Sequence, residues 1–100
     1  MYNEGTIIAL SSPPGSGAIA IIRLSGEEAI SKTDKFFKSK SGKKLKQSDG
    51  YSISYGDLVE GDEVIDEVVV SVYKAPHSYT GENIIEISCH GSNYIQQRII

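Results

Sequence analysis

Residues 76–91 read Pro-His-Ser-Tyr-Thr-Gly-Glu-Asn-Ile-Ile-Glu-Ile-Ser-Cys-His-Gly, and this stretch decides the fold that the sequence predicts. A polar loop leads into an alternating apolar segment, which predicts a β-strand over residues 84–88. The strand contains a carboxylate, Glu86, and an imidazole, His90, follows at its exit. Because loops and strand ends concentrate binding groups, we expect a site here.

Two further strands are predicted near the start of the chain. Residues 6–10 and 18–24 are β-type runs, and the second is almost entirely apolar. The segment between them, residues 11–17, contains two prolines and two glycines. It can be neither a helix nor a ladder strand, so a structured loop is predicted to join the two strands.

Two more strands are predicted in the middle of the chain. Tyr51, Ile53 and Tyr55 alternate with small residues, as in a half-buried strand. A turn is predicted at 61–62. The next strand, over residues 64–72, contains three consecutive valines, which predict burial on both faces.

A helix is predicted directly after the second strand. Ser25 and Glu28 match a capping box, and the apolar spacing over residues 30–37 predicts a helix that ends near Lys38. The following segment, 38–50, is rich in lysine and contains two glycines, so it is predicted to be a surface loop.

The chain closes with a second predicted helix, in which Ser92 is the N-cap and Ile95 and Ile99 share a face. This helix stops at Ile100 without a glycine, a basic last turn or a polar tail, so we expect the sequence to be the front part of a longer protein. The elements together predict one α/β domain of the α+β type over residues 1–100. We expect a mixed β-sheet of about five strands with two to three helices.

The composition is that of a globular domain, with 100 residues and a net charge of −3. No run is long and apolar enough to span a membrane, and no signal peptide is recognisable. A single cysteine, Cys89, cannot form an internal disulfide, so a reducing, cytoplasmic setting is expected. The charges are uneven: seven of the ten basic residues lie within 32–46, and six acids lie within 57–67.

Several kinds of site can be set aside. Residues 15–20 superficially fit a dinucleotide fingerprint, but these glycines open a β-branched strand instead of a helix. No P-loop motif for a nucleoside triphosphate occurs. His77, His90 and the single cysteine are not spaced as a metal-ligand set, so no metal site is predicted.

Arg23 and Glu86 are charged residues inside apolar strands. A buried charge must be paired, so Arg23 reaches solvent, an internal carboxylate or an anionic ligand. Glu86 faces either water or a pocket, where its two oxygens can accept the parallel donors of a guanidine-like edge, such as an arginine or a pterin. His90 is an acid or base, or a residue bonded to neighbouring backbone.

The lysines of residues 38–46 leave two interpretations open. Such a segment is most often a solvated surface, but flexible cations of this kind also contact RNA phosphates. No aromatic residues alternate with the lysines, so stacking on bases is not predicted.

Four motifs recur in order: residues 6–9, 12–26, 78–82 and 86–91. With them the chain resembles, over essentially its whole length, the amino-terminal domain of the MnmE (TrmE) family of tRNA uridine-modification GTPases. The resemblance implies a fold similar to the tetrahydrofolate-binding domain of glycine-cleavage T-type enzymes, and a homodimer formed through this domain. It implies a one-carbon donor, 5,10-methylene- or 5-formyl-tetrahydrofolate.

The family resemblance also implies a larger system. Family members carry a helical domain and a GTP-binding domain, which uses GTP, Mg²⁺ and K⁺, and neither is present in these 100 residues. With the FAD-dependent partner MnmG, they install an aminomethyl-type group at carbon 5 of the wobble uridine in tRNA. No complete active site is therefore expected in residues 1–100.

Arg23 and Glu86 match family positions that contact the folate. If the folate lies there, we expect His90, Gly91 and Ser92, at the start of the last helix, to form a pocket wall. This chain departs from many relatives at Ala20 and Ser92, where they have glycine, and both side chains could narrow the pocket. An alternative hypothesis is that the domain has a purely structural role. In that case it forms a homodimer without binding a ligand, and the Pro-Pro-Gly loop lies at the dimer interface.

Overall fold

The computed structural model describes residues 6–11, 19–47, 50–74 and 83–100. The elements follow one another as β1 (Ile7–Leu10), β2 (Ile19–Ser25), α1 (Ala29–Asp34), β3 (Phe37–Ser39), η1 (Leu45–Gln47), β4 (Ser52–Glu60), β5 (Glu63–Tyr73), β6 (Ile84–His90) and α2 (Asn93–Ile99). The predicted α+β class is confirmed. The predictions for the loops at 11–17 and 76–82 fall almost entirely outside the described residues.

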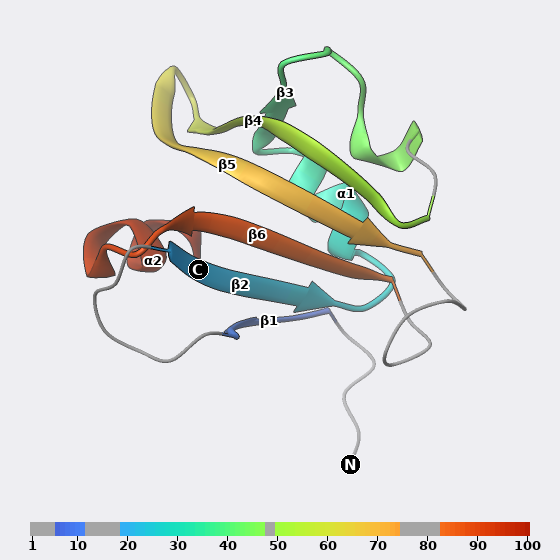
Figure 1. Cartoon of the computed structure of the whole chain (residues 1–100), viewed down its shortest axis with the longest axis horizontal. Helices are drawn as coiled ribbons and strands as arrows, with labels where there is room; N and C mark the ends of the chain where they lie inside the picture. Colours follow the sequence, from blue (N-terminus) through green and yellow to red (C-terminus); the bar gives the residue numbers. More distant parts are fainter. Residues whose placement is uncertain (1–5, 12–18, 48–49, 75–82) are drawn as a thin grey trace.

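One sheet of six strands, in the order β1-β2-β6-β5-β4-β3, forms the body of the domain (Figure 1). Within the described residues all of its pairings are antiparallel, so the prediction of a mixed sheet was wrong, whereas the predicted number of about five strands is close to the six found. A sheet is mixed when at least one pair of neighbouring strands runs parallel, and a directly connected parallel pair needs a crossover such as a helix. Here α1 leads from β2 to β3, and three other strands lie between these two in the sheet.

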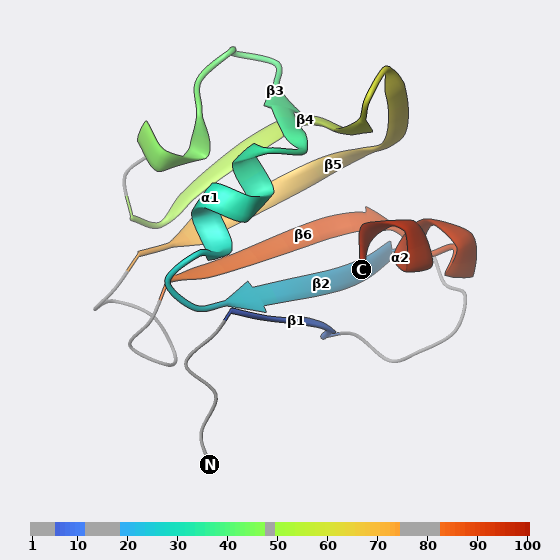
Figure 2. The same ribbon diagram turned by 180° about the vertical axis from the view of Figure 1, so that it is seen from behind.

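Both α-helices lie on the same side of the sheet, as Figure 2 shows from behind. The alternation of strand side chains sends one set toward these helices. On β2 this set is Ala20, Ile22 and Leu24, and on β6 it includes Ile85 and Ile87, all of them buried. They form the core together with Ala29, Ile30, Phe37, Leu45, Leu58, Val68, Val70, Val72 and Cys89.

The opposite side of the sheet, which we call the open face, carries the remaining side chains of the alternation. In the described part of the chain no helix lies on it (Figure 1). The alternation predicted for 51–55 is present, but its apolar residues point to the open face and are exposed, Ile53 at 75% and Tyr51 at 67%. Val69 also points there and is only half-buried, so burial of the valine run on both faces is not found.

The first helix differs from its prediction at both ends. Ser25 is not an N-cap but the last residue of β2. The helix begins at Ala29 after Glu28, whose backbone N–H donates to Thr6 Oγ1 at 3.0 Å. It ends at Asp34, and Phe37 begins the edge strand β3, where it is buried. Tertiary pairing with β4 therefore outweighs the helical periodicity of this short segment.

The predicted surface loop at 38–50 is also more ordered than expected. Its first residues belong to β3, and residues 45–47 form the short helix η1. Leu45 is completely buried against the core. Gly56 of β4 lets this edge approach closely, because a Cβ there would clash with the Lys38 carbonyl oxygen.

The end of the chain follows its prediction. Helix α2 begins at Asn93, and the Ile95 N–H donates to Ser92 Oγ at 3.4 Å, as in an N-cap. Ile95 and Ile99 pack against the core from one face of the helix. No helix in the described residues is long and apolar enough to cross a membrane.

Candidate functional site

Arg23 and Glu86, predicted as site residues from opposite ends of the chain, lie directly opposite one another on β2 and β6. Arg23 donates to Glu86 Oε2 from both Nε, at 2.9 Å, and Nη2, at 2.5 Å. The two strands place both side chains on the open face, because Ile22 and Ile87 next to them point into the core. The structure thus brings together two charges that lie 63 residues apart in the chain.

The pair is only partly shielded from solvent. The Arg23 side chain is 39% exposed and that of Glu86 is 19% exposed. Two N–H groups of Arg23 donate to the same carboxylate oxygen, Oε2, and no described residue donates a hydrogen bond to Glu86 Oε1. Of the alternatives weighed from the sequence, an arginine that meets an internal carboxylate is the one observed. One carboxylate oxygen nevertheless remains able to accept a further donor.

His90 is held on the same face by a residue that the sequence did not single out. Asp66 accepts from the His90 backbone N–H at 2.8 Å through Oδ2, and its Oδ1 lies 2.6 Å from His90 Nδ1. The Asp66 side chain is 9% exposed and that of His90 is 72% exposed. The carboxylate therefore orients the imidazole and leaves its Nε2 edge toward solvent. An acid beside Glu67 within a β-type run was the only signal for Asp66.

A shallow hollow of about 220 Å³ lies beside His90. It is lined by Ile19, Tyr55, Glu67, Val68, Val69, Ser88, Cys89 and His90. Ser88, which lines the hollow, is two positions beyond Glu86 on β6, and its side chain is therefore the next one on the open face. His90 is four residues from Glu86, or about 13 Å at the rise of a strand. Neither Arg23 nor Glu86 lines the hollow.

The other residues predicted for the pocket wall have different surroundings. Gly91 is buried directly after β6, and Ser92 caps α2. Neither of them lines the hollow on the open face. A larger cavity of about 340 Å³ lies on the helix side of the sheet, between α1 and α2, and contains none of the predicted site residues.

Metal and thiol chemistry find no support in the part of the chain that the structure describes. No group of His, Cys, Asp and Glu residues there could hold a metal ion. Burial raises the pKa of the Cys89 thiol, and its Sγ lies 3.7 Å from the Ala20 carbonyl oxygen. Cys89 therefore remains protonated and acts as a small core residue.

Comparison with known proteins identifies relatives along the whole chain. The model of the family described as "GTP-binding protein TrmE N-terminus" matches residues 6–100. A protein of Flavobacterium johnsoniae named tRNA modification GTPase MnmE is 52% identical over 100 residues, which are all of this chain and 22% of the relative. Proteins of the same name from Parabacteroides distasonis and Clostridioides difficile are 50% identical over 97 residues and 41% identical over 100 residues. These alignments cover 95% and 100% of this chain, and 21% and 22% of the relatives. The chain thus spans about a fifth of the length of the curated relatives that it matches.

Proposed function

The chain belongs to the TrmE amino-terminal family, and from that premise we propose that it binds a tetrahydrofolate derivative and forms a homodimer. The ligand is 5,10-methylene- or 5-formyl-tetrahydrofolate, the donor of a one-carbon group. The longer protein hydrolyses GTP with Mg²⁺ and K⁺ outside these residues, and acts in the cytoplasm. Together with the FAD-dependent partner MnmG it modifies carbon 5 of the wobble uridine in tRNA.

The observation that carries the folate proposal is the Arg23–Glu86 pair on the open face. A pterin presents an amino group beside a ring N–H, and both are donors that a carboxylate accepts. Glu86 Oε1 can take such a donor while Oε2 remains bonded to Arg23. Arg23 then adds a positive charge for a pterin oxygen or a glutamyl carboxylate of the ligand. The ion pair is therefore a ready-made acceptor for a ligand with both kinds of group.

The length of the open face also suits a long ligand. Glu86, Ser88 and His90 follow one another on this face of β6, and the hollow lies at the His90 end. A folate anchored at the ion pair can extend along β6 toward His90, whose ring is already oriented by Asp66. In this arrangement His90 contributes a polar edge to the pocket wall.

Dimerisation is supported by the apolar residues of the open face. Ile19 and Ile53 are 67% and 75% exposed, and Ile7, Tyr51 and Tyr55 are exposed as well. Isolated exposed apolar residues are common, but several on one uncovered sheet face are typical of an interface. The occupant that we propose is the open face of a second copy of this chain. The same residues would serve a purely structural dimerisation module, so the ligand must be tested separately.

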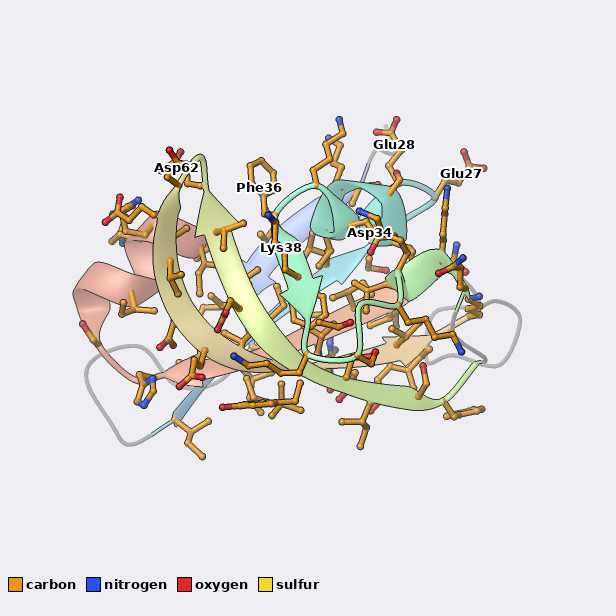
Figure 3. The ribbon with its side chains drawn as sticks, turned by 90° about the horizontal axis from the view of Figure 1, so that it is seen from above. Glu27, Glu28, Asp34, Phe36, Lys38 and Asp62 are labelled. Carbon is orange, nitrogen blue, oxygen red and sulfur yellow. The ribbon has the colours of Figure 1, made fainter. Side chains whose placement is uncertain are left out.

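Calorimetric titration of 5-formyltetrahydrofolate into the full-length protein tests the ligand. Loss of a hydrogen bond to a charged group costs about 1.5–3 kcal/mol, so Glu86→Gln and Arg23→Ala should each weaken binding at least about tenfold. Glu28→Gln is the matched control, because it removes one negative charge near α1, on the other side of the sheet (Figure 3). Unchanged affinity in both site variants would remove these residues from the folate site. A dimer that binds no folate would support the structural module instead.

Light scattering tests the interface. Ile53→Glu should convert the dimer of the 100-residue chain to a monomer, because it introduces a charge among the apolar residues of the open face. Phe36→Glu makes the same kind of change at a residue that is 48% exposed and lies near α1 (Figure 3). It should leave the dimer intact. A wild-type chain that stays monomeric at all concentrations contradicts the proposed homodimer.

A further inference from the structure

The backbone of the lysine-rich connection between β3 and β4 is held in place by contacts with the core and with α1. Leu45 is fully buried and anchors it to the core. Asp34, at the end of α1, accepts from the Leu45 N–H at 2.8 Å through Oδ1 and from the Lys46 N–H at 3.2 Å through Oδ2. Figure 3 shows Asp34 between α1 and this connection. The buried side chain and the two bonds attach η1 firmly to α1.

Further hydrogen bonds fix the backbone of residues 43–47 of this connection. Ser39 Oγ donates to the Lys43 carbonyl oxygen at 2.9 Å, and the Lys44 N–H donates to Gln47 Oε1 at 3.0 Å. Lys74, at the end of β5, donates through Nζ to the Lys46 carbonyl oxygen at 3.1 Å. The backbone that carries these lysines is therefore ordered before any ligand binds, which lowers the entropy cost of binding.

Two lysines of this region are neutralised by neighbouring acids. Lys32 lies 3.6 Å from Glu28, and Lys40 lies 3.5 Å from Asp57 and 3.6 Å from Glu67. Five others are exposed, and none of them forms an ion pair with any residue that the structure describes. We call these five the lysine platform: Lys35, Lys38, Lys43, Lys44 and Lys46.

The platform differs from the open face in chemistry as well as in place. It lies directly after α1, on β3 and on the connection to β4, at the edge of the sheet farthest from β1 and β2. Its cations are lysines, which bind phosphate as point charges and without base-specific geometry. A domain with a net charge of −3 thus keeps five lysines together that form no ion pair with any described residue, and Asp34 is the acid that bonds to their backbone.

We propose that the lysine platform docks the phosphate backbone of tRNA. This inference rests on the proposed function, in which tRNA is the substrate of the longer protein. An ordered backbone that presents several unpaired lysines suits a polyphosphate, whose backbone contacts position a nucleic acid without reading its sequence. Docking there leaves the folate site and the open face free.

The salt dependence of binding gives the expected size of the effect. Each phosphate neutralised by a lysine adds roughly 0.7–0.9 to the slope of log affinity against log salt. Removing two contacts should lower this slope by about 1.4–1.8. Between about 50 and 200 mM salt, the variant should therefore lose roughly tenfold less affinity than the wild-type chain does.

Fluorescence anisotropy with a labelled tRNA and the 100-residue chain, without folate, measures this directly. The test variant is Lys43→Gln with Lys44→Gln, which changes two exposed side chains and leaves the anchoring bonds of Leu45 and Lys46 in place. The matched control is Val64→Glu with Gln97→Glu, two exposed positions on β5 and α2. Test and control have the same net charge, so they separate a local contact from a general charge effect.

The expected result is weaker binding and a lower salt slope in the Lys43/Lys44 variant alone. Equal losses in test and control, or no tRNA binding by the wild-type chain at low salt, would overturn the proposal. Equal affinity for heparin or for vesicles of anionic phospholipid, lost in the same variant, would also overturn it, because the platform would then attract any polyanion. The folate titration is independent of this assay, so its failure alone would refute only the folate site.

Discussion

Replacing Leu45 by alanine should strongly destabilise the domain, although this residue lies in the middle of a lysine-rich segment. The side chain is 0% exposed and packs into the core cluster. The substitution removes three carbon atoms, worth about 2.4 kcal/mol at roughly 0.8 kcal/mol each, and leaves a cavity. Because the exposed flanks of η1 can partly collapse, we expect a loss near the lower part of the usual range, about 3 kcal/mol.

Urea unfolding followed by circular dichroism measures this loss. With an m-value of about 1.5 kcal/mol per M, the midpoint should fall by about 2 M without a change in m. The midpoint of thermal unfolding should decrease by roughly 12–24 °C for a domain of this size. Lys44→Ala is the control, because this neighbouring side chain is exposed and forms no ion pair with any residue that the structure describes. It should change the free energy of unfolding by less than about 0.5 kcal/mol.

The two interpretations of residues 38–50 give opposite results in this experiment. A solvated loop predicts a small effect for Leu45→Ala, similar to that of Lys44→Ala. A loss below about 1 kcal/mol for Leu45→Ala would therefore refute the buried anchor, and with it the ordered scaffold of the lysine platform.

Three further predictions follow from local geometry. Gly56→Ala should lower the free energy of unfolding by more than about 2 kcal/mol, because the new Cβ would meet the Lys38 carbonyl oxygen. Gly50→Ala should be close to neutral, because the heavy atom nearest to its Cβ would lie at 3.7 Å. Equal urea midpoints for the two variants would contradict the close approach of β3 and β4. A hydrogen bond and the positive charge of Arg98 lower the pKa of Glu63 from its ordinary value of 4.5, so the stabilisation by this pair is present above that value and is lost as the pH falls through the lowered pKa. The difference in urea midpoint between the wild-type chain and Glu63→Gln should shrink accordingly on acidification, and a difference independent of pH would argue against the pair. Because burial raises the pKa of Cys89, alkylation by iodoacetamide at about pH 8 should be slow in the native chain and fast in urea, and equal rates measured by mass spectrometry would show that the thiol is exposed.

Much of the strand pattern could be predicted because it depends on local alternation. The strands near residues 6–10, 18–24, 64–72 and 84–88 are all found, within a few residues of their predicted ends. The turn at 61–62 is found as well. The N-cap at Ser92 was also predictable, because a cap depends only on the residues of the first helical turn.

The errors occur where a distant segment outweighs a local signal. The predicted capping box at Ser25 does not form, because Ser25 pairs with β1 on one side and with β6 on the other. The first helix was expected to end near Lys38, but Phe37 instead belongs to the edge strand β3, where the phenyl ring is buried. Such pairings join residues that lie far apart in the chain, and the periodicity within one segment contains no information about them.

The amino-acid sequence by itself determined that this chain is an α+β domain of the TrmE amino-terminal family, and that Arg23 and Glu86 interrupt apolar strands. Alternation and motif order are local properties, and a single sequence contains them in full. Only the tertiary structure decided that these two charges meet, that Asp66 orients His90, and that Leu45 anchors a lysine-rich segment to the core. Each of these contacts depends on strand register and packing, which are fixed only when the whole sheet assembles.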